Sequence, residues 1–334
     1  MNNQPLFTII IPVVSINDYV RETVSVVQAL TGPAWELFVN TNLPEDNPWS
    51  QDSRIHVIHS GRVGPADKRD QASRLAQGQY LVFLDDDSYP NGDYLEIAQM
   101  AVQETNADLI GGPGITPPTD TLMQKVSGAV FSSKLTGGNP ERYLSMGASR
   151  EIDDWPSVNM IVRTSTFLSV NGFDSPYWPG EDTFLCNKLK RANARMIYYP
   201  SLIVWHHRRP GFVRHLKQVG AYGLHRGFFV KRYPTNSLRI RYFIPSLLVT
   251  LGSALAAAAL VSQAILDFAL LSLATYFFLI LTSLSITSQR HPWKVRLLAV
   301  PYVVASHIVY GFSFIRGLIL IRELRSSLRD SVDE

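Results

Sequence analysis

Residues 78–90 read GQYLVFLDDDSYP, and the apolar run in this stretch ends directly in three carboxylates. The run from Tyr80 to Leu84 has the length and composition of a buried β-strand. Three adjacent like charges repel one another, and each costs free energy to desolvate beside a buried strand. The stretch therefore predicts a strand whose end holds a positively charged partner.

Similar apolar runs precede this stretch and alternate with helical patterns. Residues 17–30 place valines at helical spacing, and residues 64–78 carry a proline near their start and a glycine at their end. Strands that alternate with helices indicate a doubly wound parallel α/β sheet, which binds ligands at the carboxyl ends of its strands. The other predicted strands are 7–14, 35–39 and 54–58.

The three acids suit a metal ion. Alternate residues of an extended segment point the same way, so Asp85 and Asp87 can converge while Asp86 faces elsewhere. Carboxylate oxygens at such a strand end suit Mg²⁺ or Mn²⁺, which could bridge to a diphosphate. The alternative is a turn whose acids cap the following helix.

Composition narrows the class of protein. The chain has 334 residues, 18% of them charged, and a net charge of +3, which argues against a nucleic-acid partner. Its one cysteine, Cys186, excludes an intrachain disulfide, and the N-terminal residues lack the basic start and the cleavage site of a signal peptide. The predicted parts are a catalytic-type α/β domain (1–204), a basic interfacial segment (205–241), a membrane region (242–321) and a basic or polar tail (322–334).

The membrane region contains two apolar segments, 243–263 and 264–286, that are each about long enough to cross a bilayer. A basic loop, SQRHPWKVR (288–296), follows them, and the segment before them is basic too. Because Lys and Arg accumulate on the cytoplasmic side, the two segments form a predicted hairpin with both ends in the cytoplasm.

The third apolar segment, 297–321, contains Pro301, His307 and Arg316, and further arginines follow it. A complete crossing would place those arginines outside, so a re-entrant or in-plane helix is favoured over a third span. The basic residues of 205–241 predict a collar that meets acidic lipid headgroups, with a solvated basic face as the alternative.

Four stretches occur in an order that resembles the family-two inverting glycosyltransferases of the GT-A fold. They are FTIIIPVV, VGPADKRDQASRLAQGQYLVFLDDDSYP, SVNMIVRTSTFLSVNGFD and WPGEDTFLCNKLKRANARMIYYPSLIVWHHRRP. The likeness covers residues 6 to about 233, and the later apolar segments look like those of membrane-bound bacterial and archaeal members. The resemblance implies a nucleotide-sugar donor and a divalent cation.

The resemblance assigns roles to residues that match the family's motifs. It implies that Asp85 and Asp87 hold the metal and the diphosphate, with Asp86 among the donor-binding residues. It also implies that an arginine lies by the nucleotide and that the backbone at the end of the first strand contacts the base. The matching residues are Arg69, Pro12 and Val13. The alternative for the arginine is a solvent-facing helix position.

The chain departs from the family after the second strand, where relatives carry an acid that helps to hold the base. Here Asn40 or Asn42 stands near that place. An amide can still pair with a base edge because it both donates and accepts. UDP is the default donor nucleotide, and the lost acid leaves other nucleotides open.

The Glu181-Asp182 pair matches the family's motif at the start of a helix. In an inverting transfer the acceptor hydroxyl loses its proton as it attacks, and a carboxylate can take that proton. The resemblance favours Asp182 as the base, with Glu181 positioning the acceptor or sharing the task. The alternative is that both acids merely complement the helix dipole.

The HHRRP stretch follows a further strand-like run. By resemblance, His206 or His207 could be a third metal ligand, and Arg208 or Arg209 could clamp phosphate through bidentate hydrogen bonds. The alternative is a basic collar at the membrane surface.

Together these features predict an inverting hexosyltransferase of the cytoplasmic membrane whose catalytic domain faces the cytoplasm. Membrane segments joined to such a domain indicate a lipid-linked acceptor of the polyprenyl-phosphate type, or a polysaccharide. A processive polysaccharide synthase is the first alternative, but the sequence lacks Gln-x-x-Arg-Trp after the Glu-Asp motif. A non-catalytic nucleotide-sugar-binding membrane protein is the second, and it would not need both carboxylate clusters.

Overall fold

The computed structural model describes residues 4–134, 138–287 and 292–324. These residues form two compact units. The first unit contains the described residues up to 117 together with 144–207, and the second contains those within 118–143 and 208–324.

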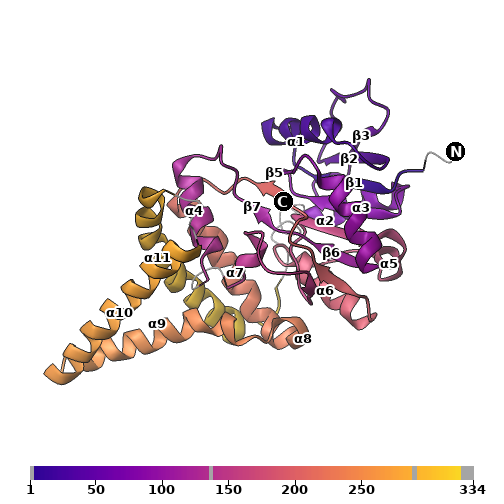
Figure 1. The fold of residues 1–334 in the computed structure, drawn as a ribbon. Coiled ribbons are helices and arrows are strands. Elements are labelled where there is room, and N and C mark those ends of the chain that lie inside the picture. The colour runs from indigo at the N-terminus through magenta and orange to yellow at the C-terminus, as the bar shows by residue number, and fades with distance from the viewer. Residues whose placement is uncertain (1–3, 135–137, 288–291, 325–334) are drawn as a thin grey trace. The chain divides into compact units, whose positions relative to one another are not determined.

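The first unit is built from short strands and helices in alternation (Figure 1). Its strands are β1 (Phe7–Pro12), β2 (Trp35–Thr41), β3 (Ile55–His59), β4 (Tyr80–Leu84), β5 (Ser88–Pro90), β6 (Leu109–Gly111), β7 (Gly114–Ile115), β8 (Arg150–Glu151), β9 (Asn159–Arg163), β10 (Met196–Tyr198) and β11 (Val204–His206). Its helices are α1 (Asp18–Ala29), α2 (Pro65–Leu75), α3 (Tyr94–Thr105), α5 (Thr164–Ser169) and α6 (Glu181–Arg191). The α/β class expected from the alternating pattern is confirmed.

Helices cover both faces of the main sheet. Side chains alternate across a strand, so Ile9 and Ile11 pack on one face with α1 and α3, whereas Ile10 packs on the other with α2 and α6. The strands are apolar on both sides for this reason, which is why they appear in the sequence as continuous apolar runs. The doubly wound arrangement places the ends of the strands, and not their faces, within reach of a ligand.

The main sheet is mixed, whereas the sequence pattern predicted a parallel one. Within the described residues its order is β3-β2-β1-β4-β9-β6-β10-β8, and β9 runs antiparallel to both β4 and β6. Strand direction depends on how distant segments connect, which apolar periodicity does not report. Strand β1 pairs in parallel with β2 on one side and β4 on the other, so the direction of winding switches beside β1. Such a switch point opens a crevice at the carboxyl ends of β1 and β4.

A second, smaller sheet has the order β5-β11-β7. Strand β5 follows the acids after β4, and it pairs antiparallel with β11, which ends at His206. Two segments more than 110 residues apart in the chain are therefore hydrogen-bonded to each other next to the end of β4.

The second unit is helical. One helix comes from the middle of the chain, although the linear division predicted that residues 1–204 would form one domain. Residues 118–143 group with the later helices. The elements are α4 (Leu122–Ser132), a short 3-10 helix (Pro140–Arg142), α7 (Phe212–Arg232), α8 (Pro234–Ser237), α9 (Ile240–Ala259), α10 (Gln263–Thr287), α11 (Trp293–Ile315) and a π-helical end, η2 (Arg316–Leu320).

A buried histidine explains why α4 belongs with these helices. His215 of α7 is fully buried, and its Nδ1 lies 2.8 Å from the Ser127 hydroxyl of α4 while its Nε2 lies 2.9 Å from the Ser306 hydroxyl of α11. Burial lowers the pKa of His215 to about 4, so the ring is neutral at pH 7, with one nitrogen donating and the other accepting. An apolar cluster that joins α4 to α10 and α11 completes the contact.

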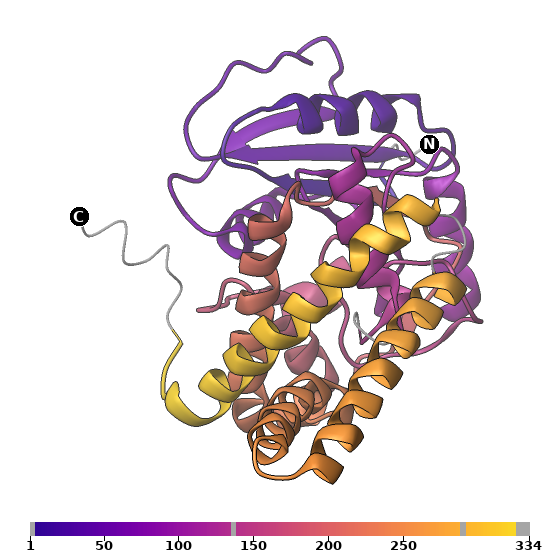
Figure 2. The ribbon, with the colours of Figure 1, turned by 90° about the vertical axis from the view of Figure 1, so that its left-hand side faces the viewer.

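Among the described residues, α9, α10 and the α11–η2 helix are long and apolar enough to cross a membrane. Figure 1 shows α9 and α10 side by side and running in opposite directions, and Figure 2 shows α11 as one long yellow helix. The third apolar segment is thus one helix from Trp293 to Leu320. Whether it crosses the bilayer or lies in its plane stays a prediction. Residues 288–291 of the basic loop and 325–334 of the tail lie outside the described residues.

Glycines let α7 and the α11–η2 helix approach closely. A Cβ on Gly227 would lie 2.1 Å from the carbonyl oxygen of Phe314, and a Cβ on Gly317 would lie 2.0 Å from that of Leu224. Neither backbone could move away without separating the two helices. Small residues allow this kind of contact between helices.

We expect Gly227→Ala to destabilise the second unit, because overpacking a tight contact costs about 1–3 kcal/mol. Gly252→Ala is the matched control: Gly252 is also helical, but a Cβ there would meet nothing within 4 Å. The control should be neutral or slightly stabilising, since alanine favours the helix. Thermal unfolding of the two purified variants in detergent checks this, and equal midpoints would contradict the close approach.

Candidate active site

The turn after β4 is closed by one serine. The Ser88 hydroxyl accepts a hydrogen bond from the Asp85 N–H at 3.0 Å and donates one to the Asp85 carbonyl oxygen at 2.9 Å. The expected turn is therefore present, but its acids do not cap the next helix. Strand β5 intervenes, and Asp93 is the N-cap residue of α3.

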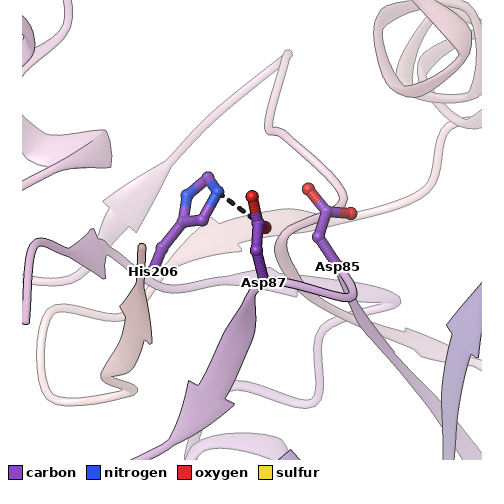
Figure 3. A group of neighbouring side chains, drawn as sticks. All are labelled: Asp85, Asp87 and His206. Carbon is purple, nitrogen blue, oxygen red and sulfur yellow. Dashed lines mark ion pairs between the residues drawn. The ribbon is translucent and has the colours of Figure 1, made fainter. Parts of the chain in front are cut away.

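Asp85, Asp87 and His206 form a group that could hold a metal ion. Each offers one ligand atom, and these atoms all lie within 4.8 Å of one another (Figure 3). Nε2 of His206 is 3.1 Å from Oδ1 of Asp87. The antiparallel register sets this approach, since His206 of β11 pairs with Ser88 of β5, next to Asp87. Two carboxylates and one imidazole are a donor set that fits a divalent cation such as Mn²⁺.

His207 has different neighbours. Its Nε2 lies 2.9 Å from Oε2 of Glu22, and its ring packs against Tyr19 and Tyr89, at centroid distances of 4.6 and 5.6 Å. The sequence left His206 and His207 open as the third ligand. The geometry brings His206 to the two aspartates and directs His207 toward α1.

Arg69 of α2 joins the two acidic motifs. Its Nη2 lies 2.5 Å from Oδ1 of Asp85, and its Nη1 lies 3.4 Å from Oε1 of Glu181. The arginine is 2% exposed, so the solvent-facing alternative does not hold. Its Nε is buried and has no hydrogen-bond partner among the described residues. A buried guanidinium with a donor to spare can bind a further acceptor, such as a phosphate oxygen.

Helix α6 begins at the Glu-Asp motif, after Gly180 at φ +115°. Glu181 is almost fully buried, and burial, reinforced by the charge of Asp182, raises the pKa of Glu181 to about 7 although Arg69 opposes the shift. Asp182 is partly exposed and accepts a hydrogen bond from the Thr183 N–H at 2.7 Å. The two neighbours thus differ: Glu181 is held by an arginine, and Asp182 reaches the surface.

A buried lysine, Lys68, contacts the backbone at the end of β1. Pro12 is the last residue of β1, and the carbonyl oxygen of Val13 accepts a hydrogen bond from Nζ of Lys68. Burial lowers the pKa of Lys68 to about 8, and the nearby Asp86 opposes that shift. Burial also raises the pKa of Asp86 to about 6, with the charges of Asp87 and Asp85 adding to it. The negative charge of Asp86 therefore favours the protonated form of Lys68.

Asn40 and Asn42 differ in what they contact. Asn40 is fully buried in β2, and its Nδ2 donates to the Lys68 carbonyl oxygen at 2.9 Å, so it holds α2 against the sheet. Asn42 lines a cavity of about 380 Å³ together with Val14 and Glu45. Its Oδ1 is buried and has no hydrogen-bond partner among the described residues. Of the two, Asn42 is the one placed to meet a ligand.

Arg208 and Arg209 belong to the second unit. The Arg208 N–H donates to Oδ2 of Asp120 at 3.2 Å, and its guanidinium carbon lies 5.0 Å from the ring centroid of Tyr143. Arg208 is 5% exposed, whereas Arg209 is exposed. Their assignment as phosphate clamps stays a prediction.

The sequence analysis missed three charged residues near the site: Lys68, Asp70 and Glu22. Asp70 accepts hydrogen bonds from the backbone N–H groups of Phe173 and Asp174 at 2.7 and 2.8 Å, which fixes the loop before α6. For Lys68 and Asp70, the run of charged residues in α2 could have indicated a buried charge. Three consecutive helical residues cover an arc of about 200°, so at least one charge of residues 68–70 had to face the sheet. No comparable signal marks Glu22, because its partner is 185 residues away.

Residues 8–168 match the model of the family described as Glycosyl transferase family 2. TuaG of Bacillus subtilis (strain 168), a glycosyltransferase named for teichuronic acid biosynthesis, is 33% identical over 103 residues, which is 28% of this chain and 41% of TuaG. The pre-mycofactocin glycosyltransferase of Mycobacterium tuberculosis is 26% identical over 198 residues, which is 55% of this chain and 38% of that protein. The chain thus matches about two fifths of the length of these curated relatives.

Among solved structures, the chain is similar to the mannosyltransferase PcManGT from Pyrobaculum calidifontis, in complex with GDP-Man and Mn²⁺. The TM-score is 0.60 at 17% sequence identity, and the match covers 95% of this chain and 88% of that one. At this identity the likeness concerns the fold, and it confirms the GT-A fold that the sequence implied.

Proposed function

Since residues 8–168 form a glycosyl transferase family 2 domain, we propose that the protein is a membrane-bound inverting glycosyltransferase that moves a sugar from a nucleotide sugar to a lipid-linked or polysaccharide acceptor. The observation that carries the proposal is the convergence of Asp85, Asp87 and His206 at the end of β4. Arg69 links this group to the Glu-Asp motif at the start of α6.

Asp85, Asp87 and His206 would hold Mn²⁺ or Mg²⁺. When bound, the cation supplies charge that neutralises the departing nucleoside diphosphate. Arg69 adds a second positive group beside Asp85 of the metal group, and its unpartnered Nε can donate to a phosphate oxygen. The Mn²⁺ in the PcManGT complex supports this choice of cofactor.

Asp182 is our proposed base for the acceptor hydroxyl. It is the more exposed of the two acids, so a hydroxyl can reach it. Glu181 has a pKa raised to about 7, which would also suit a base. Its carboxylate is nearly buried against Arg69, however, and this favours a positioning role. Glu181 would then fix the start of α6 relative to Arg69 and Asp85.

The cavity beside Asn42 is our proposed pocket for the nucleotide base. The buried Oδ1 of Asn42 can accept a hydrogen bond from an N–H group of the base. In relatives, the acid after the second strand would accept that hydrogen bond. UDP remains the default nucleotide, and the GDP-Man of PcManGT supports testing GDP as well.

A lipid-linked acceptor is our proposal because α9, α10 and the α11–η2 helix are apolar enough to enter a membrane. The name of TuaG, which refers to teichuronic acid, supports the polysaccharide alternative. We place the protein in the cytoplasmic membrane with its α/β unit facing the cytoplasm.

A donor screen tests the proposed activity. The full chain, purified in detergent, is incubated with UDP- and GDP-sugars, Mn²⁺ or Mg²⁺, and polyprenyl phosphate or a glycan acceptor. We expect one donor to give transfer, or slow hydrolysis without acceptor, and chelation of the metal to stop both. Neither transfer nor hydrolysis with any donor, in protein that remains folded, would contradict the proposed function.

The proposed topology predicts the outcome of cysteine labelling in intact cells. Ser288→Cys, in the basic loop, should resist a membrane-impermeant thiol reagent, because that loop is predicted to be cytoplasmic. Gln263→Cys is the matched control: it lies at the α9–α10 junction, which the hairpin places outside, and it should be labelled. The native Cys186 is fully buried and should give little background. The reverse labelling pattern would overturn the hairpin.

A further inference from the structure

The first turns of α1 contact His207 and Ser88, which are next to the candidate metal ligands in the chain, although α1 carries none of the ligands. We propose that α1 is a positioning element for the metal ligands, acting through Glu22 on His207 and through Thr23 on Ser88. The inference rests on the proposed function, because it concerns the same metal group.

Glu22 fixes His207. Its Oε2 lies 2.9 Å from Nε2 of His207, so the ring donates its Nε2 hydrogen to the carboxylate. Tyr19, one turn earlier on α1, packs on the same ring in a tilted arrangement with the ring centroids 4.6 Å apart, and Tyr89 of β5 packs on it at a centroid distance of 5.6 Å. The imidazole is 10% exposed and is held by contacts from both α1 and β5.

His207 passes this constraint to the metal group through the backbone. Its N–H donates to the Asp87 carbonyl oxygen at 2.9 Å. The residue before it is His206, whose Nε2 lies 3.1 Å from Oδ1 of Asp87. A fixed His207 therefore fixes the backbone of His206, the preceding residue, directly. It fixes the backbone of Asp87 through one hydrogen bond.

Thr23 acts on the third ligand, Asp85, through Ser88. Its hydroxyl donates to the Ser88 carbonyl oxygen at 2.7 Å, and this contact is buried. The Ser88 side chain in turn closes the turn that starts at Asp85, with hydrogen bonds of 3.0 and 2.9 Å. Thr23 thus anchors the residue that sets the conformation of Asp85.

Asn17 is the N-cap residue of α1. Its Oδ1 accepts a hydrogen bond from the Val20 N–H at 3.0 Å, which fixes the first turn of the helix. One end of a single helix is therefore linked to Asp85 through Thr23 and Ser88, and to Asp87 through Glu22 and His207.

The physical reason for such an element is charge repulsion. Three adjacent carboxylates favour conformations in which they separate, and a cation must first bring them together. Contacts from α1 hold the backbone in the binding arrangement beforehand. Loss of a group that orients a metal ligand typically weakens metal affinity by roughly 10–100-fold.

The test measures Mn²⁺ affinity of the full chain in detergent, by the loss of the electron paramagnetic resonance signal of free Mn²⁺. Glu22→Ala and Thr23→Val should each weaken binding by about tenfold or more. Glu22→Gln and Thr23→Ser keep the acceptor and the donor, and each should retain most of the affinity. Arg21→Ala is the control on the same helix turn, since Arg21 is exposed, and it should bind as the wild type does.

A purely structural role would give a different pattern. Glu22→Ala would then lower the unfolding temperature but leave Mn²⁺ affinity within twofold of the wild type, and that result would overturn the inference while the proposed function stands. If wild type and Asp87→Asn bind Mn²⁺ equally, the metal group itself is wrong and both proposals fall. Turnover at saturating Mn²⁺ gives a second readout: positioning variants should recover much of it, and Asp87→Asn should not.

Discussion

Asp87→Asn should lower the rate of sugar transfer by roughly a hundredfold or more, since a bound cation contributes several kcal/mol and each 1.4 kcal/mol is a factor of ten. The amide keeps the shape of the side chain but removes the charge that faces His206 and Asp85. The neighbouring ligands would then hold the cation weakly, and the departing diphosphate would lose its main counter-charge. The measurement is turnover at saturating donor over a range of Mn²⁺ concentrations.

Asp93→Asn is the control for this prediction. Asp93 is an exposed acid six residues later, and its carboxylate accepts a hydrogen bond from Asn91 without reaching the metal group. It should leave turnover unchanged. Full activity of Asp87→Asn, together with full activity of the wild type in excess chelator, would show that Asp85 and Asp87 do not act through a metal.

Asp182→Asn should reduce kcat by roughly a hundredfold or more, the usual size of a general-base contribution. The amide preserves the start of α6 but cannot take a proton from the acceptor hydroxyl. Donor affinity should survive, because in the proposed function it rests on the metal group, Arg69 and the cavity beside Asn42. An interaction needed mainly in the transition state appears in kcat at saturating substrates. Calorimetry of donor binding and turnover with saturating acceptor separate the two effects.

Glu181→Gln distinguishes the two neighbouring acids. If Glu181 only positions α6, its amide can still accept a hydrogen bond from Arg69, and the loss should be smaller than for Asp182→Asn. The opposite order, with Asp182→Asn active and Glu181→Gln inactive, would assign the base to Glu181, whose pKa is raised to about 7. Activity in both variants would leave α6 as a helix whose first-turn acids only complement its dipole.

Several features could be predicted from local sequence because their physical causes are local. A strand buried on both faces must be apolar throughout, so β1 and β4 stand out as runs of Ile, Val, Leu and Phe. Residues just beyond such a run lie at the carboxyl end of a strand, which placed Asp85–Asp87 at the crevice. The length of an apolar helix needed to cross a bilayer is also a local quantity, and it identified the three later segments.

The choice between neighbouring candidates depended on contacts between distant parts of the chain. His206 and His207 are adjacent and chemically identical, but the register of β11 against β5 turns one toward Asp87 and the other toward Glu22. Asn40 lies inside β2 and donates a hydrogen bond to the backbone of α2, whereas Asn42 lies beyond the strand and lines a cavity. Residue type alone could not separate either pair.

The α/β class, the acids at the end of β4 and the apolar segments could thus be read from the chain alone, because periodicity and hydrophobicity are encoded within a few residues. The Glu-Asp motif at the start of α6 was identified through the family resemblance. The antiparallel insertion of β9, the grouping of α4 with the later helices and the contacts of α1 with Ser88 and His207 appear only in the folded chain. These depend on strand pairing and on single hydrogen bonds that join residues 65 to 185 positions apart. Such contacts leave no repeating pattern in the sequence, since each needs only one suitable side chain at each end.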